Sequence, residues 1–212
     1  IFAEHIQTVV FLYIIKEYKM TNRIKRMVAA AICLALCYTL PFLTGQIQGI
    51  GRMLCPMHLP VFICGFVCGR WWGLAVGFVA PLLRSVTLGM PPIFPDAVSM
   101  AVELAVYGFA AALVYDLLPK KLPYTYVSLI SAMLCGRVAW GAMRYVIAGI
   151  SKTKFTFPMF LAGAFTRAFP GIIVQLLLVP AVIELLRRTG NISRERNPER
   201  VATENPLQAI DK

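Results

Sequence analysis

Residues 94–118 read FPDAVSMAVELAVYGFAAALVYDLL, and this stretch decides the fold class. Its only charged residues are Asp96, Glu103 and Asp116, so it supplies the roughly 20 mostly apolar residues that a helix needs to cross a bilayer. Only helices and closed barrels satisfy every backbone hydrogen bond in lipid. The stretch lacks the period-two alternation of a barrel strand, and we therefore expect a transmembrane helix here.

Five further apolar stretches predict an all-α polytopic membrane protein with six transmembrane helices. The other five expected helices cover residues 27–43, 53–69, 72–88, 122–150 and 157–187. The composition agrees, because 58% of the residues are hydrophobic, 15% are charged and the mean hydropathy is +0.70. A water-soluble domain of this size would struggle to bury so much apolar surface.

The two ends of the chain differ from this membrane domain. The basic sequence MTNRIKR at 20–26 is typical of the start of a membrane protein. The apolar part of residues 1–19 is too short to span and lacks a small-residue cleavage site. We therefore expect an N-terminal extension over 1–19, upstream of a transmembrane domain over 20–188. The polar tail, residues 189–212, is expected to be disordered and cytoplasmic.

The positive charge is distributed as membrane topology requires. The formal net charge is +11, and Lys and Arg cluster before the first apolar stretch, at 120–121 and after residue 186. An excess of basic residues marks the cytoplasmic loops of membrane proteins. With an even number of spans, both termini are expected in the cytoplasm and the protein in the cell membrane. This distribution argues against a nucleic-acid partner, which would need one basic surface.

Ionisable residues inside the apolar stretches identify a candidate site. Each costs at least about 2.5–3.5 kcal/mol at the centre of a span, so it is expected to face the bundle interior. Alternating topology and a rise of about 1.5 Å per residue place each one in depth. Five, from five different spans, are expected in the outer half: His58, Arg84, Glu103, Arg144 and Arg167. Tyr107 and Trp140 lie one turn from Glu103 and Arg144, with Arg137 near the middle of its span.

This convergence predicts a small-molecule cavity that opens to the outside and is floored by aromatic rings. The arginines outnumber the acids Asp96 and Glu103 nearby. Because arginine favours bidentate binding of carboxylate or phosphate, an anionic or carboxylate-bearing ligand is expected. Two alternatives stay open: Arg84 and Arg144 extend to the outer interface, or Glu103 is a structural partner of one arginine.

No cofactor, metal site or catalytic motif is expected. The six cysteines lie nearly all in apolar stretches, where cysteine behaves as a small hydrophobe more often than as part of a disulfide framework. Cys55 and His58 form a C-x-x-H pair, but His5 is the only other histidine, which is too few ligands for zinc. The phosphate-binding loop motif, G-x-S-x-G and H-E-x-x-H are all missing. ATP-driven work would therefore need other subunits.

Small residues predict where helices approach closely. Ala31 and Ala35 form a small-xxx-small pattern in the first span, which lets another helix pack tightly in lipid. Glycines continue at the same spacing across the second and third spans: Gly65, Gly69, Gly73 and Gly77. They predict tight packing between these two spans, and ordinary internal packing is the alternative for the alanines as well.

Several motifs together carry a family resemblance. Besides the basic start and Ala31-x-x-x-Ala35, they are PFLTGQ at 41–46, MHLPVF at 57–62, GMPPIFP at 89–95, MAVELAVYG at 100–108 and GRVAWG at 136–141. The chain resembles the substrate-capturing subunits, or S-components, of energy-coupling factor (ECF) transporters. The likeness covers residues 20–188, is closest to a Clostridia-like branch and extends more loosely to pantothenate-type members.

The resemblance implies a vitamin-uptake subunit that binds its substrate near the outer surface and then topples against a shared transmembrane subunit, driven by two ATPase subunits. Ala31 and Ala35 would face the shared subunit. The ligand site would be formed by loop 44–52 together with these residues: Glu103, Tyr107, Trp140, Arg144, Gly163 and Arg167. The histidine-bearing N-terminus of nickel and cobalt relatives is not matched, so a metal substrate is not expected.

The substrate stays open at this point. Candidates are pantothenate, another carboxylated vitamin, or a nucleobase-like precursor such as those of queuosine. Two other functions are kept as alternatives: an intramembrane hydrolase that uses Glu103 with His58 as acid and base, and a structural membrane subunit without a ligand.

Overall fold

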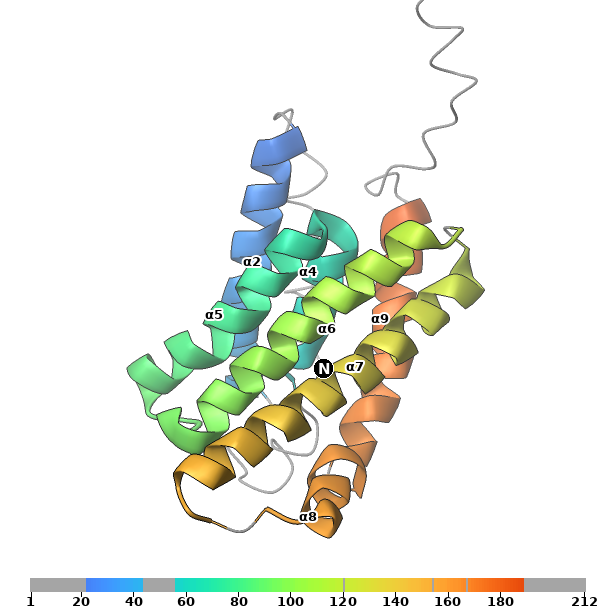
Figure 1. The fold of residues 1–212 in the computed structure, drawn as a ribbon. Coiled ribbons are helices and arrows are strands. Elements are labelled where there is room, and N and C mark those ends of the chain that lie inside the picture. Colours follow the sequence, from blue (N-terminus) through green and yellow to red (C-terminus); the bar gives the residue numbers. More distant parts are fainter. Residues whose placement is uncertain (1–21, 44–55, 120, 154, 167, 189–212) are drawn as a thin grey trace, which may run out of the picture.

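The structure is a computed structural model that describes residues 22–43, 56–119, 121–153, 155–166 and 168–188. Within these residues every regular element is helical (Figure 1). The longer helices are α2 (Asn22–Leu43), α4 (His58–Cys68), α5 (Arg70–Leu88), α6 (Val98–Leu117), α7 (Leu122–Ile150) and α9 (Phe169–Arg188). The short segments are η1 (Ile93–Ala97), α8 (Phe157–Leu161) and η2 (Ala162–Thr166). The expectations for 1–19, 44–52 and 189–212 concern residues outside this described part.

Helix α6 lies at the centre of the bundle. It packs against α4, α5 and α7, while α2 packs against α4 and α5, and α9 packs against α4 and α7 (Figure 1). In the span that includes α6, 56% of the most apolar window is buried, compared with 22–39% in the other four long helices. Side chains on α6 are therefore the ones best placed to meet residues from several helices.

Five of the described helical stretches are long and apolar enough to cross a membrane: α2, α5, η1 with α6, α7 and α9. This confirms the predicted fold class, an all-α polytopic membrane protein. The fifth predicted span, 122–150, coincides with α7.

The second predicted span, 53–69, is helical only over α4 within the described residues. Its 11 residues rise about 16 Å, roughly half the thickness of the hydrocarbon core. Nine of the 11 are buried, so neighbouring helices rather than lipid surround it. Gly69, with a φ of 99°, then joins α4 directly to α5, and this conformation favours glycine.

The sixth predicted span, 157–187, is interrupted. Helix α8 ends at Leu161, the π-helical turn η2 follows, and α9 begins at Phe169. Pro170 explains the position of the new start. A proline has no N–H to donate to the residue four positions earlier and its ring clashes with that carbonyl, whereas the first turn of a helix tolerates it.

Glycines bring α4, α5 and α6 into backbone contact. A Cβ added to Gly65 would lie 2.5 Å from the carbonyl oxygen of Gly108, and a Cβ on Gly73 would lie 2.7 Å from the same oxygen. The second of these would also lie 2.8 Å from the Cα of Gly65. The predicted tight packing of the second and third spans is therefore confirmed, and it includes α6.

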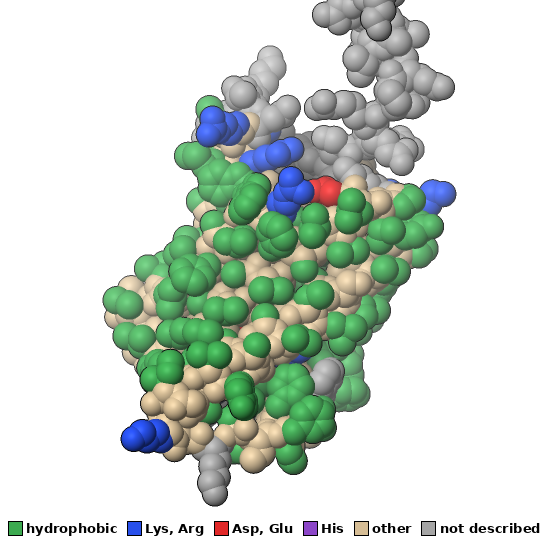
Figure 2. All heavy atoms as spheres, viewed as in Figure 1, with side chains coloured by type: hydrophobic (Ala, Val, Ile, Leu, Met, Phe, Trp, Pro, Cys, Tyr) green, Lys and Arg blue, Asp and Glu red, His purple; other side chains and the backbone are tan. Residues whose placement is uncertain are grey.

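Figure 2 shows hydrophobic side chains over the sides of the bundle and a concentration of Lys and Arg at one end. This basic end, where α2 begins and α9 ends, carries the following described residues: Arg23, Lys25, Arg26, Arg70, Lys121, Arg187 and Arg188. An apolar belt with a charged end is the surface that a membrane-embedded protein needs.

Candidate substrate-binding site

Two ion pairs at two depths link α7 to α6 and to η1, the segment directly before α6. Glu103 pairs with Arg137, and Asp96 pairs with Arg144. The two acids, Asp96 in η1 and Glu103 in α6, are seven positions apart, and so are the two arginines on α7; seven positions rise about 10 Å along a helix. The predicted site residues therefore fall into two groups, two helical turns apart, rather than one.

The buried cluster consists of His58, Glu103, Tyr107 and Arg137, from α4, α6 and α7. Glu103 Oε1 accepts a hydrogen bond of 2.8 Å from the Tyr107 hydroxyl and lies 2.9 Å from Arg137 Nη1. Glu103 is 3% exposed and Arg137 is 7% exposed. The cation and the hydroxyl donor together offset much of the free energy that it costs to remove the carboxylate charge from water.

His58 completes the buried cluster from the first turn of α4. Its Nε2 lies 3.8 Å from Glu103 Oε1, and neither ring nitrogen has a hydrogen-bond partner among the described residues. The imidazole packs against the Tyr107 ring, with centroids 5.3 Å apart, and Phe62 stacks on the same ring at 4.9 Å.

Close packing fills the space around the buried cluster. A Cβ on Gly136 would collide with the Tyr107 ring, so α7 approaches α6 closely only because this position is glycine. Tyr107 is 1% exposed and His58 is 2% exposed. This geometry joins three helices, and it matches the alternative in which Glu103 is a structural partner of one arginine.

The end cluster consists of Asp96, Trp140, Arg144 and Gly163 and lies at the end of the bundle opposite the basic end. The Arg144 guanidinium pairs with the Asp96 carboxylate and lies over the Trp140 ring, 5.5 Å from its centroid. Both charged side chains stay partly open, with 39% of Asp96 and 25% of Arg144 exposed. A second charged group can therefore approach this pair.

Aromatic rings and two glycines position Trp140. Phe155 and Phe160 lie at centroid distances of 6.1 Å and 6.3 Å from it. A Cβ on Gly163 would lie 2.6 Å from Trp140 Cη2, and a Cβ on Gly141 would collide with the Phe160 ring. The missing side chains at these glycines are what let the segment after α7 fold back against α7.

A cavity of about 410 Å³ adjoins Arg144. Its lining residues come from η1, from the end of α7 and from the segment that leads into α8: Phe94, Pro95, Arg144, Ile147, Ala148, Ser151, Thr153, Phe155 and Met159. The volume lies within the roughly 300–1,000 Å³ of small-molecule sites. One cation and two hydroxyl groups in an otherwise apolar wall suit a compact ligand with an acidic end.

The remaining predicted residues lie elsewhere. Arg84 Nε donates to the carbonyl oxygen of Met90 at 3.2 Å, and Arg84 does not line the cavity. Arg167 lies outside the described residues, as does loop 44–52. Ala31 and Ala35 are exposed on α2. The ligand roles predicted for these residues, and for both clusters, stay predictions.

Sequence reasoning missed most of the cavity wall. It named Asp96 only as an acid near the arginines, although the shared spacing of seven positions on consecutive antiparallel spans was a readable sign of its pairing with Arg144. Phe94, Phe155 and Met159 carried no comparable signal, because apolar residues at span ends are common. Among the described residues, no group of three or more His, Cys, Asp or Glu side chains is placed to hold a metal ion.

Comparison with known proteins assigns the family. A family model described as ECF transporter, substrate-specific component, matches residues 25–183, which is most of the chain. No curated protein and no solved structure matches the chain. The matched region includes all five long helices almost completely and both clusters. The chain therefore belongs to the family of substrate-specific components of ECF transporters, membrane proteins that bind a substrate for uptake and are not themselves enzymes.

Proposed function

We propose that this subunit captures a small, carboxylate-bearing, vitamin-like compound near the outer face of the cell membrane. It delivers the compound by toppling against the shared transmembrane subunit, while two partner ATPase subunits supply the energy. Family membership supports the general role of substrate capture. The substrate class and the delivery motion go beyond the family match and belong to our proposal.

The observation that carries the proposal is the cavity beside Arg144. It lies at the end of the bundle opposite the basic end. Because basic ends stay in the cytoplasm, the cavity would open toward the outside, where an importer meets its substrate. Arginine with an apolar and aromatic wall is the combination that retains an acidic compound with a hydrophobic body.

The Asp96–Arg144 pair refines the expected charge of the ligand. Asp96 already balances Arg144, so the cavity carries less positive charge than the count of arginines in the sequence indicated. A carboxylate must share Arg144 with Asp96 or displace it. One carboxylate group satisfies this arrangement better than a phosphate with two charges.

Helix α2 supports the coupling part of the proposal. Its buried side carries Ala29, Ala30 and Cys33, while Ala31 and Ala35 are exposed. Only 22% of its apolar window is buried, the smallest share among the long helices. Small exposed residues at four-residue spacing allow a partner helix to approach closely in lipid.

The two alternative functions gain no support from the site. A hydrolase would need Glu103 to reach a substrate, but Tyr107 and Arg137 already hold its carboxylate in a packed interior. A ligand-free structural subunit has no use for a cavity beside a partly open ion pair. Neither alternative agrees with the family match.

The test is mass spectrometry of compounds released from purified protein, with Arg144→Ala as the variant. Losing a charged hydrogen bond of about 1.5–3 kcal/mol predicts a roughly tenfold to 150-fold loss of affinity. Arg70→Ala, at the basic end, is the matched control and should retain the compound. Equal retention by Arg144→Ala and the parent, or a parent that binds no acidic compound, would refute the proposal.

A further inference from the structure

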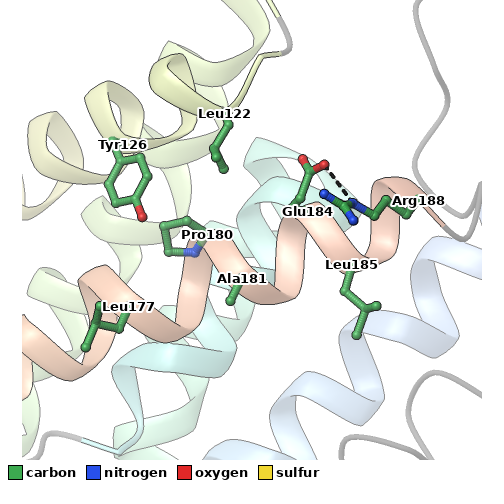
Figure 3. A pocket seen from close by; sticks show the side chains of 8 residues that line it. All are labelled: Leu122, Tyr126, Leu177, Pro180, Ala181, Glu184, Leu185 and Arg188. Carbon is green, nitrogen blue, oxygen red and sulfur yellow. Dashed lines mark hydrogen bonds and ion pairs between the residues drawn. The ribbon is translucent and has the colours of Figure 1, made fainter.

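A groove outside the bundle runs between the start of α7 and the end of α9, away from both clusters (Figure 3). Its volume is about 330 Å³, and Leu122, Leu177 and Leu185 form its apolar wall. These three leucines are 42%, 66% and 44% exposed, so they face the surroundings of the bundle rather than its core.

The length of the groove matches one leaflet of a bilayer. Leu177, Ala181, Leu185 and Arg188 follow one another at helical spacing and form one stripe on α9. The 11 steps from Leu177 to Arg188 rise about 16 Å, and half of the hydrocarbon core is about 15 Å thick. The stripe therefore extends from the end of the span to about the middle of the membrane, as an acyl chain does.

The charges at the end of the groove select an anionic headgroup. Glu184 lies 3.2 Å from Arg188 Nε and 3.3 Å from Arg187 Nη1, and exposed Lys121 precedes Leu122 at the start of α7. Three basic groups against one carboxylate leave an excess of positive charge. The Arg188 side chain is 76% exposed, so its guanidinium is open to a phosphate at the membrane surface.

We infer that this groove binds an anionic phospholipid, with one acyl chain along Leu177, Ala181 and Leu185 and the phosphate at Arg188. A helix of a partner subunit is the competing occupant. Closely packed membrane helices favour small residues at their contact, whereas this wall presents large leucines. The groove holds one small exposed residue, Ala181, whereas the exposed pair at four-residue spacing, Ala31 and Ala35, lies on α2. The lipid inference does not depend on the identity of the transported substrate.

The test is native mass spectrometry of the purified chain with equal amounts of phosphatidylglycerol and phosphatidylcholine added. The parent should retain phosphatidylglycerol preferentially. Arg188→Gln should weaken that binding about fivefold, the effect of one basic residue near a membrane surface, without changing phosphatidylcholine. Arg70→Gln removes a basic residue at the same end but outside the groove, and it should behave as the parent.

Ala181→Trp fills the groove from an exposed position and should abolish the preference for phosphatidylglycerol. Thermal unfolding checks that Ala181→Trp is folded. Arg188→Gln tests lipid binding at the same groove without adding a bulky side chain. Equal retention of the two lipids by the parent would overturn the inference. So would an Arg188→Gln variant that binds phosphatidylglycerol as the parent does, or a folded Ala181→Trp variant that keeps the preference of the parent for phosphatidylglycerol.

Discussion

Replacing Gly163 with alanine tests whether the position of Trp140 sets the substrate site. The added Cβ would lie 2.6 Å from Trp140 Cη2. Ordinary contact begins at 3.4 Å, so the indole ring would have to withdraw by about 0.8 Å. Overpacking of this kind typically costs about 1–3 kcal/mol. Because Arg144 lies over the same ring, displacement of the ring also moves the guanidinium that adjoins the cavity.

We expect Gly163→Ala to lower retention of the bound compound by roughly fivefold to 150-fold, the range that corresponds to about 1–3 kcal/mol. The assay is mass spectrometry of the released compound, with thermal unfolding measured alongside. Gly149→Ala is the matched control, because an added Cβ at this exposed position on α7 meets nothing within 4 Å. It should leave retention of the compound unchanged and should not lower the thermal stability, because alanine is favoured over glycine within a helix.

A second substitution makes the test specific to the ring. Phenylalanine at position 140 lacks the atoms nearest to Gly163, namely Cη2, Cζ3 and Cζ2 of the indole. Trp140→Phe combined with Gly163→Ala should therefore be less damaging than the sum of the two single changes, which a double-mutant cycle measures. Simple additivity, or a Gly163→Ala variant that binds and unfolds like the parent, would refute the reasoning.

Three further predictions follow from other contacts. Arg137→Met leaves the Glu103 carboxylate buried without its cation, and thermal unfolding should show a loss of about 3–5 kcal/mol; a smaller loss than from an exposed arginine would contradict this. Gly73→Ala places a Cβ 2.7 Å from the backbone oxygen of Gly108 on α6. The folded yield of this variant should therefore drop well below that of Gly149→Ala. Asp96→Asn leaves Arg144 with its full charge and should increase retention of a carboxylate compound severalfold; decreased retention would show that Asp96 itself binds the ligand.

The sequence predicted the bounds of the helix over 122–150 well. This apolar stretch coincides with α7, because Pro123 suits the first turn of a helix and no later proline interrupts the stretch. The same reasoning failed for 53–69, since α4 is enclosed by protein and no bilayer constraint fixes its length. The stretch 157–187 was predicted as one span with a bend at Pro170, and the structure has a break before α9 at this place.

The sequence reasoning about the candidate site used depth in the membrane and did not address position around the bundle axis. Rise per residue locates a side chain along the membrane normal and says nothing about which neighbour it meets. Arg84 and Arg144 were therefore grouped together, although Arg84 bonds to a nearby carbonyl and Arg144 pairs with Asp96. Uncertainty of a few residues at span ends also merged two levels that are two turns apart.

The two ion pairs have the same spacing on both sides of the contact, so together they fix the axial position of α7 relative to η1 and α6. Any axial shift of one helix against the other would separate Glu103 from Arg137 and Asp96 from Arg144 at the same time. An axial shift would therefore break two ion pairs, and we expect the two helices to move together as one rigid body. Among the described residues, no ion pair ties the connection between α7 and α8 to these two helices.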